Sequence, residues 1–99
     1  YHLIIDRDGQ VHKGRPIQAI GAHVRGHNHH SLGVCLIGGL GEDDRPENNF
    51  TSAQMLALHM LVESLQLRYP QAEVVGHYEL DPRKDCPAFI VSDWLEEYL

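Results

Sequence analysis

The chain opens with Tyr1-His2-Leu3-Ile4-Ile5-Asp6-Arg7-Asp8-Gly9-Gln10-Val11-His12-Lys13, and this stretch is the main indication of the fold class. Residues 1–6 combine aromatic and β-branched side chains, which favour a strand. The Asp8-Gly9 pair is a strong signal for a tight hairpin turn, so we predict a second strand over residues 11–13. Gly14-Arg15-Pro16 then ends the pairing, because proline has no N–H to donate to a ladder.

A third strand and a long helix follow. Residues 32–38 form a near-continuous apolar run closed by glycines, which predicts a central strand covered on both faces. Thr51 and Gln54 have the spacing of a capping box, so we expect a helix with Thr51 as N-cap that ends at Pro70. Its apolar face is expected to contain the residues that recur at helical spacing, namely Met55, Leu58, Leu61, Val62, Leu65 and Tyr69.

The C-terminal part predicts one more strand and one more helix. Residues 73–76 resemble a short strand that delivers His77 at its end, residues 77–88 a loop, and residues 91–99 an amphipathic helix with Ser92 as a possible N-cap. The whole order indicates an α/β fold: a small mixed central sheet flanked by helices, in a single domain over residues 1–99.

Composition excludes several classes of protein. With 99 residues, 42% hydrophobic and 22% charged, the chain can bury one modest core. A formal net charge of -6 argues against nucleic acid as a partner, because such domains need a basic face. The longest apolar stretch, residues 32–40, is too short for a membrane span, and no signal peptide is visible.

Histidine and cysteine are the residues that suggest chemistry. The cluster His27-Asn28-His29-His30 lies in an irregular loop, where it is either a solvated surface or a contact for substrate or metal. His77 and Cys86 are residue types that zinc prefers, and a Pro-flanked loop separates them. A catalytic zinc usually has three protein ligands, so a third ligand would have to come from elsewhere.

Three further side chains also bear on the function. Lys84 is either a solvated loop lysine or a cation that stabilises an oxyanion beside a metal. Tyr1 by default packs at the start of its strand, with its phenol in water. Cys35, inside the apolar run, is expected to be a buried small hydrophobe rather than half of a disulfide framework.

Several motifs together resemble a known family. Residues 1–15, residues 21–39, Phe50-Thr51-Ser52-Ala53-Gln54-Met55 and residues 77–89 occur in the order found in type 2 N-acetylmuramoyl-L-alanine amidases. This family includes the amidase-type lysozymes of phages and, more distantly, the peptidoglycan recognition proteins. The resemblance covers nearly the whole chain, and it implies a mixed sheet with a zinc ion at one edge of a peptide-binding groove.

The resemblance also implies roles for individual residues. His77 and Cys86 would be two of three zinc ligands, Tyr1 and Lys84 the catalytic pair beside the metal, and His23 and Asn28 would lie near the groove. In the family the third ligand is a histidine in an N-terminal segment that precedes the position of Tyr1. We therefore expect an N-terminally truncated domain that lacks this ligand, a strand and a helix.

The function implied is hydrolysis of the amide between N-acetylmuramic acid and L-alanine of peptidoglycan, with the 99-residue chain itself inactive. Such an enzyme would reside in the host cytoplasm before release to the cell wall or periplasm. The exposed sheet edge would invite self-association. Two alternatives remain at this point: a non-catalytic module of the same fold that binds peptidoglycan or protein, and a purely structural α/β domain.

Overall fold

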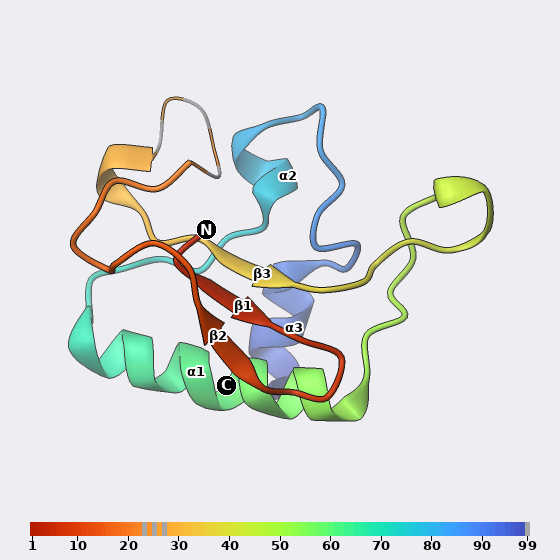
Figure 1. Ribbon diagram of the computed structural model, residues 1–99, viewed down its shortest axis with the longest axis horizontal. Helices are drawn as coiled ribbons and strands as arrows, with labels where there is room; N and C mark the ends of the chain where they lie inside the picture. Colours follow the sequence, from red (N-terminus) through yellow and green to blue (C-terminus); the bar gives the residue numbers. More distant parts are fainter. Residues whose placement is uncertain (23, 25, 27, 99) are drawn as a thin grey trace.

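The architecture is one small sheet with two longer helices packed on it (Figure 1). The computed structural model describes residues 1–22, 24, 26 and 28–98. The strands and helices, with two single 3₁₀ turns η1 and η2, are β1 (Leu3–Ile5), β2 (Val11–Lys13), η1 (Asn28–His30), β3 (Val34–Leu36), η2 (Glu42–Asp44), α1 (Ser52–Arg68), α2 (His77–Leu80) and α3 (Val91–Tyr98).

The sheet is mixed, as the sequence predicts. Its strand order is β2-β1-β3, with β1 antiparallel to β2 and parallel to β3. Ile4 pairs with His12 on one side and with Cys35 on the other. The prediction that residues 32–38 form a central strand covered on both faces is wrong: β3 is shorter, half-buried and at the edge of the described sheet, because it pairs with β1 alone among the described strands.

The hairpin turn between β1 and β2 forms where the Asp8-Gly9 pair predicts it. Asp6 N–H donates to Gln10 O over 3.0 Å, and Gly9 N–H donates to Asp6 O over 3.0 Å. Gly9 has a φ of +86° and lies so close to Ala53 that a Cβ atom would overlap the Ala53 carbonyl. This glycine is therefore required both for the left-handed turn and for the approach of the turn to α1.

Helix α1 begins and ends where its sequence indicates. Thr51 is the N-cap, and the capping box is complete: Gln54 N–H donates to Thr51 Oγ1 over 3.0 Å and Thr51 N–H donates to Gln54 Oε1 over 3.0 Å. The helix stops at Arg68, with Tyr69 as C-cap directly before Pro70. Local residues alone thus determine both ends of this helix.

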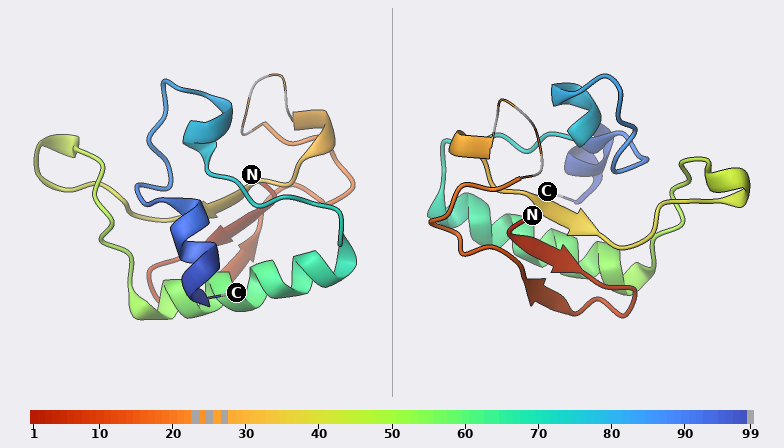
Figure 2. Two further views of the ribbon diagram at one scale, coloured as in Figure 1. Left: turned by 180° about the vertical axis from the view of Figure 1, so that it is seen from behind. Right: turned by 45° about the horizontal axis from the view of Figure 1, so that its top comes forward.

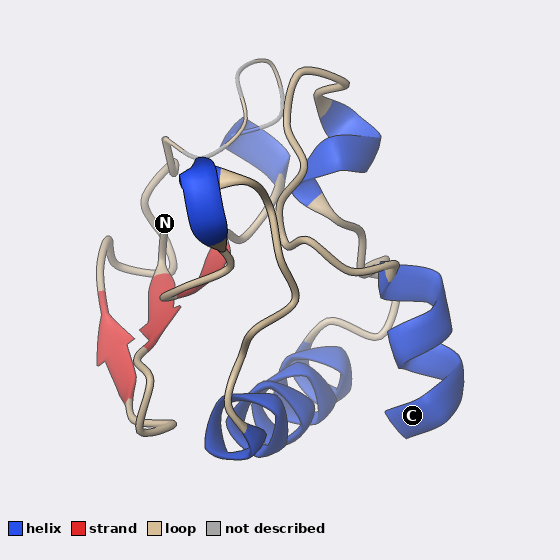
Figure 3. Ribbon diagram, turned by 90° about the vertical axis from the view of Figure 1, so that its right-hand side faces the viewer, coloured by secondary structure: helices blue, strands red, loops and turns tan. Residues whose placement is uncertain are grey.

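The hydrophobic core lies between the sheet and the two longer helices. Figure 3 shows α1 and α3 on the same side of the sheet, and the buried cluster joins all three: Ile5 from β1, Leu58 and Val62 from α1, and Trp94 from α3. Leu58 and Val62 confirm the predicted buried face of α1. Its opposite face differs from a simple amphipathic helix, because Leu56, Met60 and Leu67 are exposed.

The structure corrects three predictions in the C-terminal part. Residues 73–76 form no strand, because they pair with no strand in the described part of the chain. The segment predicted as a loop from residue 77 begins instead with the single helical turn α2. Helix α3 starts at Val91, so Ser92 lies inside its first turn and is not the N-cap.

Two further observations complete the description. The loop that carries η2 extends away from the rest of the molecule (Figure 2). Among the described residues, no helix has both the length and the apolar character needed to cross a bilayer.

Candidate active site

Segments distant in sequence gather at one end of the molecule. The start of β1, the loop with η1, and α2 all lie at this end, in both the front view and the tilted view (Figures 1 and 2). The described residues for which a catalytic, metal-binding or substrate-binding role is expected belong to these segments or to the loop that follows α2. This end is therefore the candidate site.

His77 is the first residue of α2 and is half-buried. Its Nδ1 atom is buried and has no hydrogen-bond partner within the described part of the chain. A buried polar atom without a partner costs about 1–3 kcal/mol, so it is rare unless another group satisfies it. A metal ion is such a group, because a neutral imidazole nitrogen is a preferred zinc ligand. His77 thus fits the role of a metal ligand.

Cys86 lies in the loop after α2, exposed and with a free thiol. Its carbonyl oxygen accepts a hydrogen bond from the N–H of Tyr78 over 3.2 Å. This bond closes residues 78–86 into a ring, which brings the backbone of Cys86 next to the residue after His77. An imidazole and a free thiol on one closed segment form two of the ligands that zinc prefers. No group of three such ligands is found among the described residues.

Tyr1, just before β1, is 36% exposed. Burial raises the pKa of its phenol, and the nearby thiols of Cys35 and Cys86 raise this pKa further. The phenol is therefore protonated at neutral pH and able to donate a hydrogen bond. The effect of both thiols on one phenol also means that Tyr1, Cys35 and Cys86 share one neighbourhood. Burial, followed by Cys86, raises the pKa of the Cys35 thiol as well.

Lys84 is exposed, two residues before Cys86, and its N–H donates to Asp81 O over 3.0 Å. Arg83, not Lys84, binds the Asp81 carboxylate, with Arg83 Nε 3.0 Å from Oδ1 and Nη2 3.1 Å from Oδ2. These hydrogen bonds from Arg83 are the main reason that the pKa of Asp81 falls to about 2, and the charge of Lys84 is a smaller cause. Tyr1 is thus near enough to Cys86 for the thiol to affect the pKa of the phenol, and Lys84 is exposed two residues before Cys86.

The two residues expected near a groove have different outcomes. His23 lies outside the described residues. Asn28 is in η1, and its Oδ1 atom accepts a hydrogen bond from the N–H of the buried Val24 over 2.8 Å. Asn28 therefore helps to fold its own loop, whatever else it contacts.

His2 is a site residue that the sequence analysis misses. It is only 1% exposed, its Nε2 atom is 2.8 Å from Ala19 O, and its Nδ1 atom is 3.1 Å from Gly33 N. Since a carbonyl accepts and an N–H donates, His2 is the neutral tautomer with its proton on Nε2. His2 thereby joins the start of β1 to Ala19, in the loop before η1, and to Gly33, directly before β3. A histidine on the inward side of an apolar strand was the available signal.

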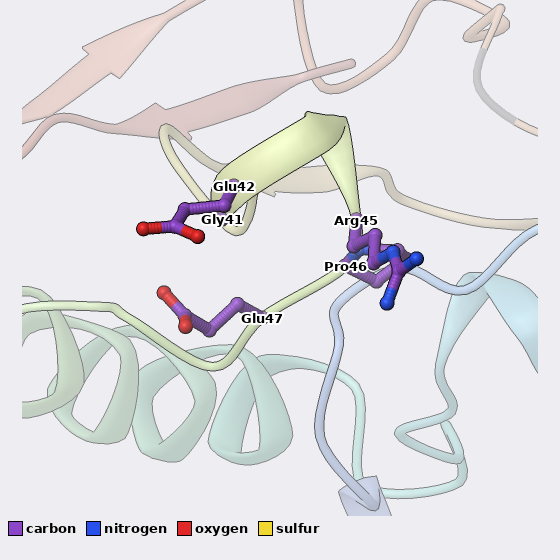
Figure 4. A pocket seen from close by; sticks show the side chains of 5 residues that line it. All are labelled: Gly41, Glu42, Arg45, Pro46 and Glu47. Carbon is purple, nitrogen blue, oxygen red and sulfur yellow. The ribbon is translucent and has the colours of Figure 1, made fainter.

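A separate hollow lies in the protruding loop (Figure 4). It has a volume of about 520 Å³ and is lined by Gly41, Glu42, Arg45, Pro46 and Glu47. The carboxylates of Glu42 and Glu47 face one another across it, and Arg45 points away. None of the candidate site residues lines this hollow, so it is not the candidate active site.

The sequence matches the model of a known protein family over most of its length. The family described as N-acetylmuramoyl-L-alanine amidase (Amidase_2) matches residues 1–89, which include Tyr1, His77, Lys84 and Cys86. This chain belongs to that family. The mixed sheet with flanking helices, expected from the resemblance, is confirmed as the fold of an amidase.

Relatives of this amidase-family chain include phage endolysins. It is 46% identical to the endolysin of Klebsiella phage KP32 and 44% identical to the endolysin of Escherichia phage T7, each over 97 residues. These alignments cover 98% of the chain and 64% of each endolysin, so the chain spans just under two thirds of these relatives. A Haemophilus influenzae protein is 38% identical, with 90% of the chain and 88% of that protein covered.

Solved structures agree with the family assignment. The endolysin N-acetylmuramoyl-L-alanine amidase LysCS from Clostridium intestinale superimposes with a TM-score of 0.83 at 27% identity. The superposition covers 98% of this chain and 61% of LysCS.

Proposed function

We propose that this chain carries most of the catalytic groups of a zinc-dependent N-acetylmuramoyl-L-alanine amidase. The reaction is hydrolysis of the amide that joins the lactyl group of N-acetylmuramic acid to L-alanine of the peptidoglycan stem peptide. One observation carries the proposal: the buried Nδ1 of His77 without a described partner, on a segment that a hydrogen bond closes onto Cys86.

His77 Nδ1 and Cys86 Sγ would hold the zinc ion, and a third protein ligand would come from beyond these 99 residues. When bound, the ion would activate water at neutral pH and polarise the substrate carbonyl. Zinc binding requires Cys86 as a thiolate, which its exposure and free state allow. With only two protein ligands, we expect the 99-residue chain to bind zinc weakly and to show little amidase activity.

Tyr1 and Lys84 would act on the charges that develop in the substrate. Since its pKa is raised, the Tyr1 phenol keeps its proton at neutral pH and can donate a hydrogen bond to the carbonyl oxygen. The exposed Lys84 ammonium would stabilise negative charge on the same oxygen as water adds to the carbonyl carbon. The C–N bond then breaks, and the leaving nitrogen receives the proton that the attacking water loses.

The loop that contains η1 would form one wall of the substrate groove, with Asn28 on it, and His23 is also expected to contact the substrate. The attachment of this loop to β1 through His2 would keep this wall at a fixed distance from Tyr1. The polymer substrate places the site of action at the cell wall, which the enzyme would reach after release from the host cytoplasm.

The test uses the polypeptide encoded by the complete reading frame that contains these residues. With purified sacculi, we expect soluble fragments that carry new amino-terminal L-alanine. New reducing ends without new alanine amino groups would identify a glycosidase and contradict the proposal. Retention on insoluble peptidoglycan without release of fragments would identify a binding module of the same fold.

A further inference from the structure

Tyr78 directly follows His77, and its contacts connect the metal-ligand segment to the core. We propose that Tyr78 is a positioning residue that fixes the His77 imidazole and the Cys86 thiol relative to each other and to α3. This inference rests on the proposed metal role of His77 and Cys86. Tyr78 itself would bind neither metal nor substrate.

The backbone of Tyr78 makes the first connection. Its N–H donates to Cys86 O over 3.2 Å. The residue that follows His77 is therefore joined directly to the backbone of Cys86. Rigid placement of ligands before the ion arrives reduces the conformational entropy lost on binding. This bond requires α2 to keep its present orientation, and the side-chain contacts of Tyr78 would hold α2 in that orientation.

The phenol of Tyr78 makes the second connection. Its oxygen accepts a hydrogen bond from Val91 N–H over 3.1 Å. Val91 is the first residue of α3, and an N–H in the first turn of a helix has no partner within the helix. Val91 and Trp94 are 4% and 5% exposed, so this end of α3 is anchored in the core. The phenol thus ties the segment that carries His77 and Cys86 to the buried end of α3.

The ring of Tyr78 makes the third connection, to Gly76. A Cβ atom on Gly76 would overlap the Cε1 and Cδ1 atoms of the ring, so this edge of the ring packs directly against the glycine. Gly76 is buried, and its N–H donates to Glu79 Oε2 over 2.6 Å. Gly76 and Tyr78 therefore pack as a pair on either side of His77, which restricts the backbone from which the imidazole projects.

Groups around a metal site that orient its ligands typically change metal affinity by about 10–100-fold when they are removed. The variant Tyr78→Phe keeps the ring against Gly76 and removes only the oxygen that accepts from Val91. We therefore expect the lower end of this range, an affinity for Cd²⁺ about tenfold weaker than that of the parent.

Cadmium–thiolate absorption measures this affinity, because it reports binding to a cysteine rather than to the exposed histidines. Titrations of the 99-residue chain would compare Tyr78→Phe with Tyr69→Phe, the same chemical change at the C-cap of α1. Cys86→Ser should abolish the absorption. A tenfold loss in Tyr78→Phe with parental affinity in Tyr69→Phe supports the proposal, whereas equal affinity in both variants overturns it.

Hydrogen exchange in the unsubstituted chain provides a second readout that does not depend on folding of a variant. If Tyr78 couples the ligand segment to α3, Cd²⁺ should slow exchange of the Val91 amide. Unchanged exchange at Val91 with Cd²⁺ bound would also overturn the proposal. Failure of the unsubstituted chain to bind Cd²⁺ through Cys86 would contradict the proposed metal site itself, together with the role of Tyr78.

Discussion

Helix α1 and the segment 77–88 are built in opposite ways. The ends of α1 are fixed by its own sequence, through the capping box of Thr51 and Gln54 and the stop at Pro70. The segment 77–88 has one helical turn, and its shape comes from contacts with residues outside that turn, such as Cys86 and Val91. The difference teaches that the scaffold depends on local signals, whereas the site depends on how distant segments meet.

The strongest test of this contrast is Lys84→Ala, made in the polypeptide of the complete reading frame. Lys84 is exposed, so its loss should change the free energy of unfolding by no more than about 0.5 kcal/mol. Loss of a group that stabilises an oxyanion typically costs about 2.7–4 kcal/mol of barrier, so turnover of sacculi should fall by two to three powers of ten. Rates of fragment release measure the effect.

Arg83→Ala is the matched control, because Arg83 is an adjacent exposed cation. It binds Asp81 rather than facing the proposed substrate, so the variant should retain turnover within a few-fold of the parent. Equal losses in both variants would mean that the charge of the loop matters, not the position of Lys84.

The corresponding test of the scaffold is Gln54→Ala. Gln54 is fully buried, and beyond the capping box its Nε2 donates to Ile37 O over 2.7 Å and to Ile5 O over 3.3 Å. Its Oε1 atom also accepts from Arg7 Nη1 over 3.2 Å. Removing the amide breaks these hydrogen bonds of a fully buried side chain together with its contacts in the capping box, so we expect a loss of about 3 kcal/mol in the free energy of unfolding.

Urea denaturation measures this loss, with Gln66→Ala as the control on the same helix. Gln66 is half-buried and outside the capping box, so its substitution should cost about 0.5 kcal/mol or less. Similar values for both variants would show that packing of Leu58 and Val62 holds α1 in place, and that the polar contacts of Gln54 are secondary.

The same contrast explains what the sequence could predict. The hairpin at Asp8-Gly9 and the capping box of α1 were predictable, because each signal lies within a few residues. The capping pattern identified Gln54 but not its bonds to β1 and to Ile37, directly after β3, since these depend on the packing of α1 on the sheet. The strand predicted over residues 73–76 fails because apolar character alone does not provide a neighbouring strand.

The site was predictable only through family resemblance. Spacing alone did not distinguish Lys84 from a solvated lysine, or Tyr1 from a packing residue. The abundance of histidine drew attention instead to the cluster of residues 27–30. His2 and Tyr78 were missed, because their roles consist of contacts with segments far away in sequence. Physical patterns in a sequence therefore predict elements more readily than the tertiary contacts that arrange a site.

A smaller effect concerns the edge of the sheet at β3. Gly33 O accepts from β1 and Ile37 N–H donates to it, so the peptide groups of Val34 and Leu36 face away from β1. An unpaired edge of this kind can pair with another chain, and we expect weak, concentration-dependent self-association in sedimentation experiments. Ile37 is 46% exposed beside this edge, so Ile37→Glu should reduce the association.

Ile90→Glu is the control for this experiment, because Ile90 is also exposed, at 59%, and lies before α3 rather than beside β3. Both variants add the same charge, so only the position differs. An equal reduction in both would indicate that net charge controls the association, and the edge of β3 would have no special part in it.

The smallest expected effect is a pH dependence at the hairpin turn. Asp6 accepts hydrogen bonds from the N–H groups of Asp8 and Gln10, each over 3.0 Å, and its Oδ2 is 2.7 Å from His12 Nε2. The hydrogen bond from His12 is the largest cause that lowers the pKa of Asp6, and the bond from Gln10 is the next.

A carboxyl group whose pKa is lower in the folded state stabilises the fold above its ordinary pKa, about 3.9, and loses this contribution as the pH falls through the folded value. Asp6→Asn removes the charge, so its deficit in unfolding free energy should shrink as the pH falls below about 4. Asp8→Asn, an exposed change on the same turn, should show no such trend. A deficit for Asp6→Asn that persisted unchanged into acid would mean that the charge of the carboxylate does not stabilise the turn. The backbone preference of Asp8-Gly9 would then be sufficient to order the turn.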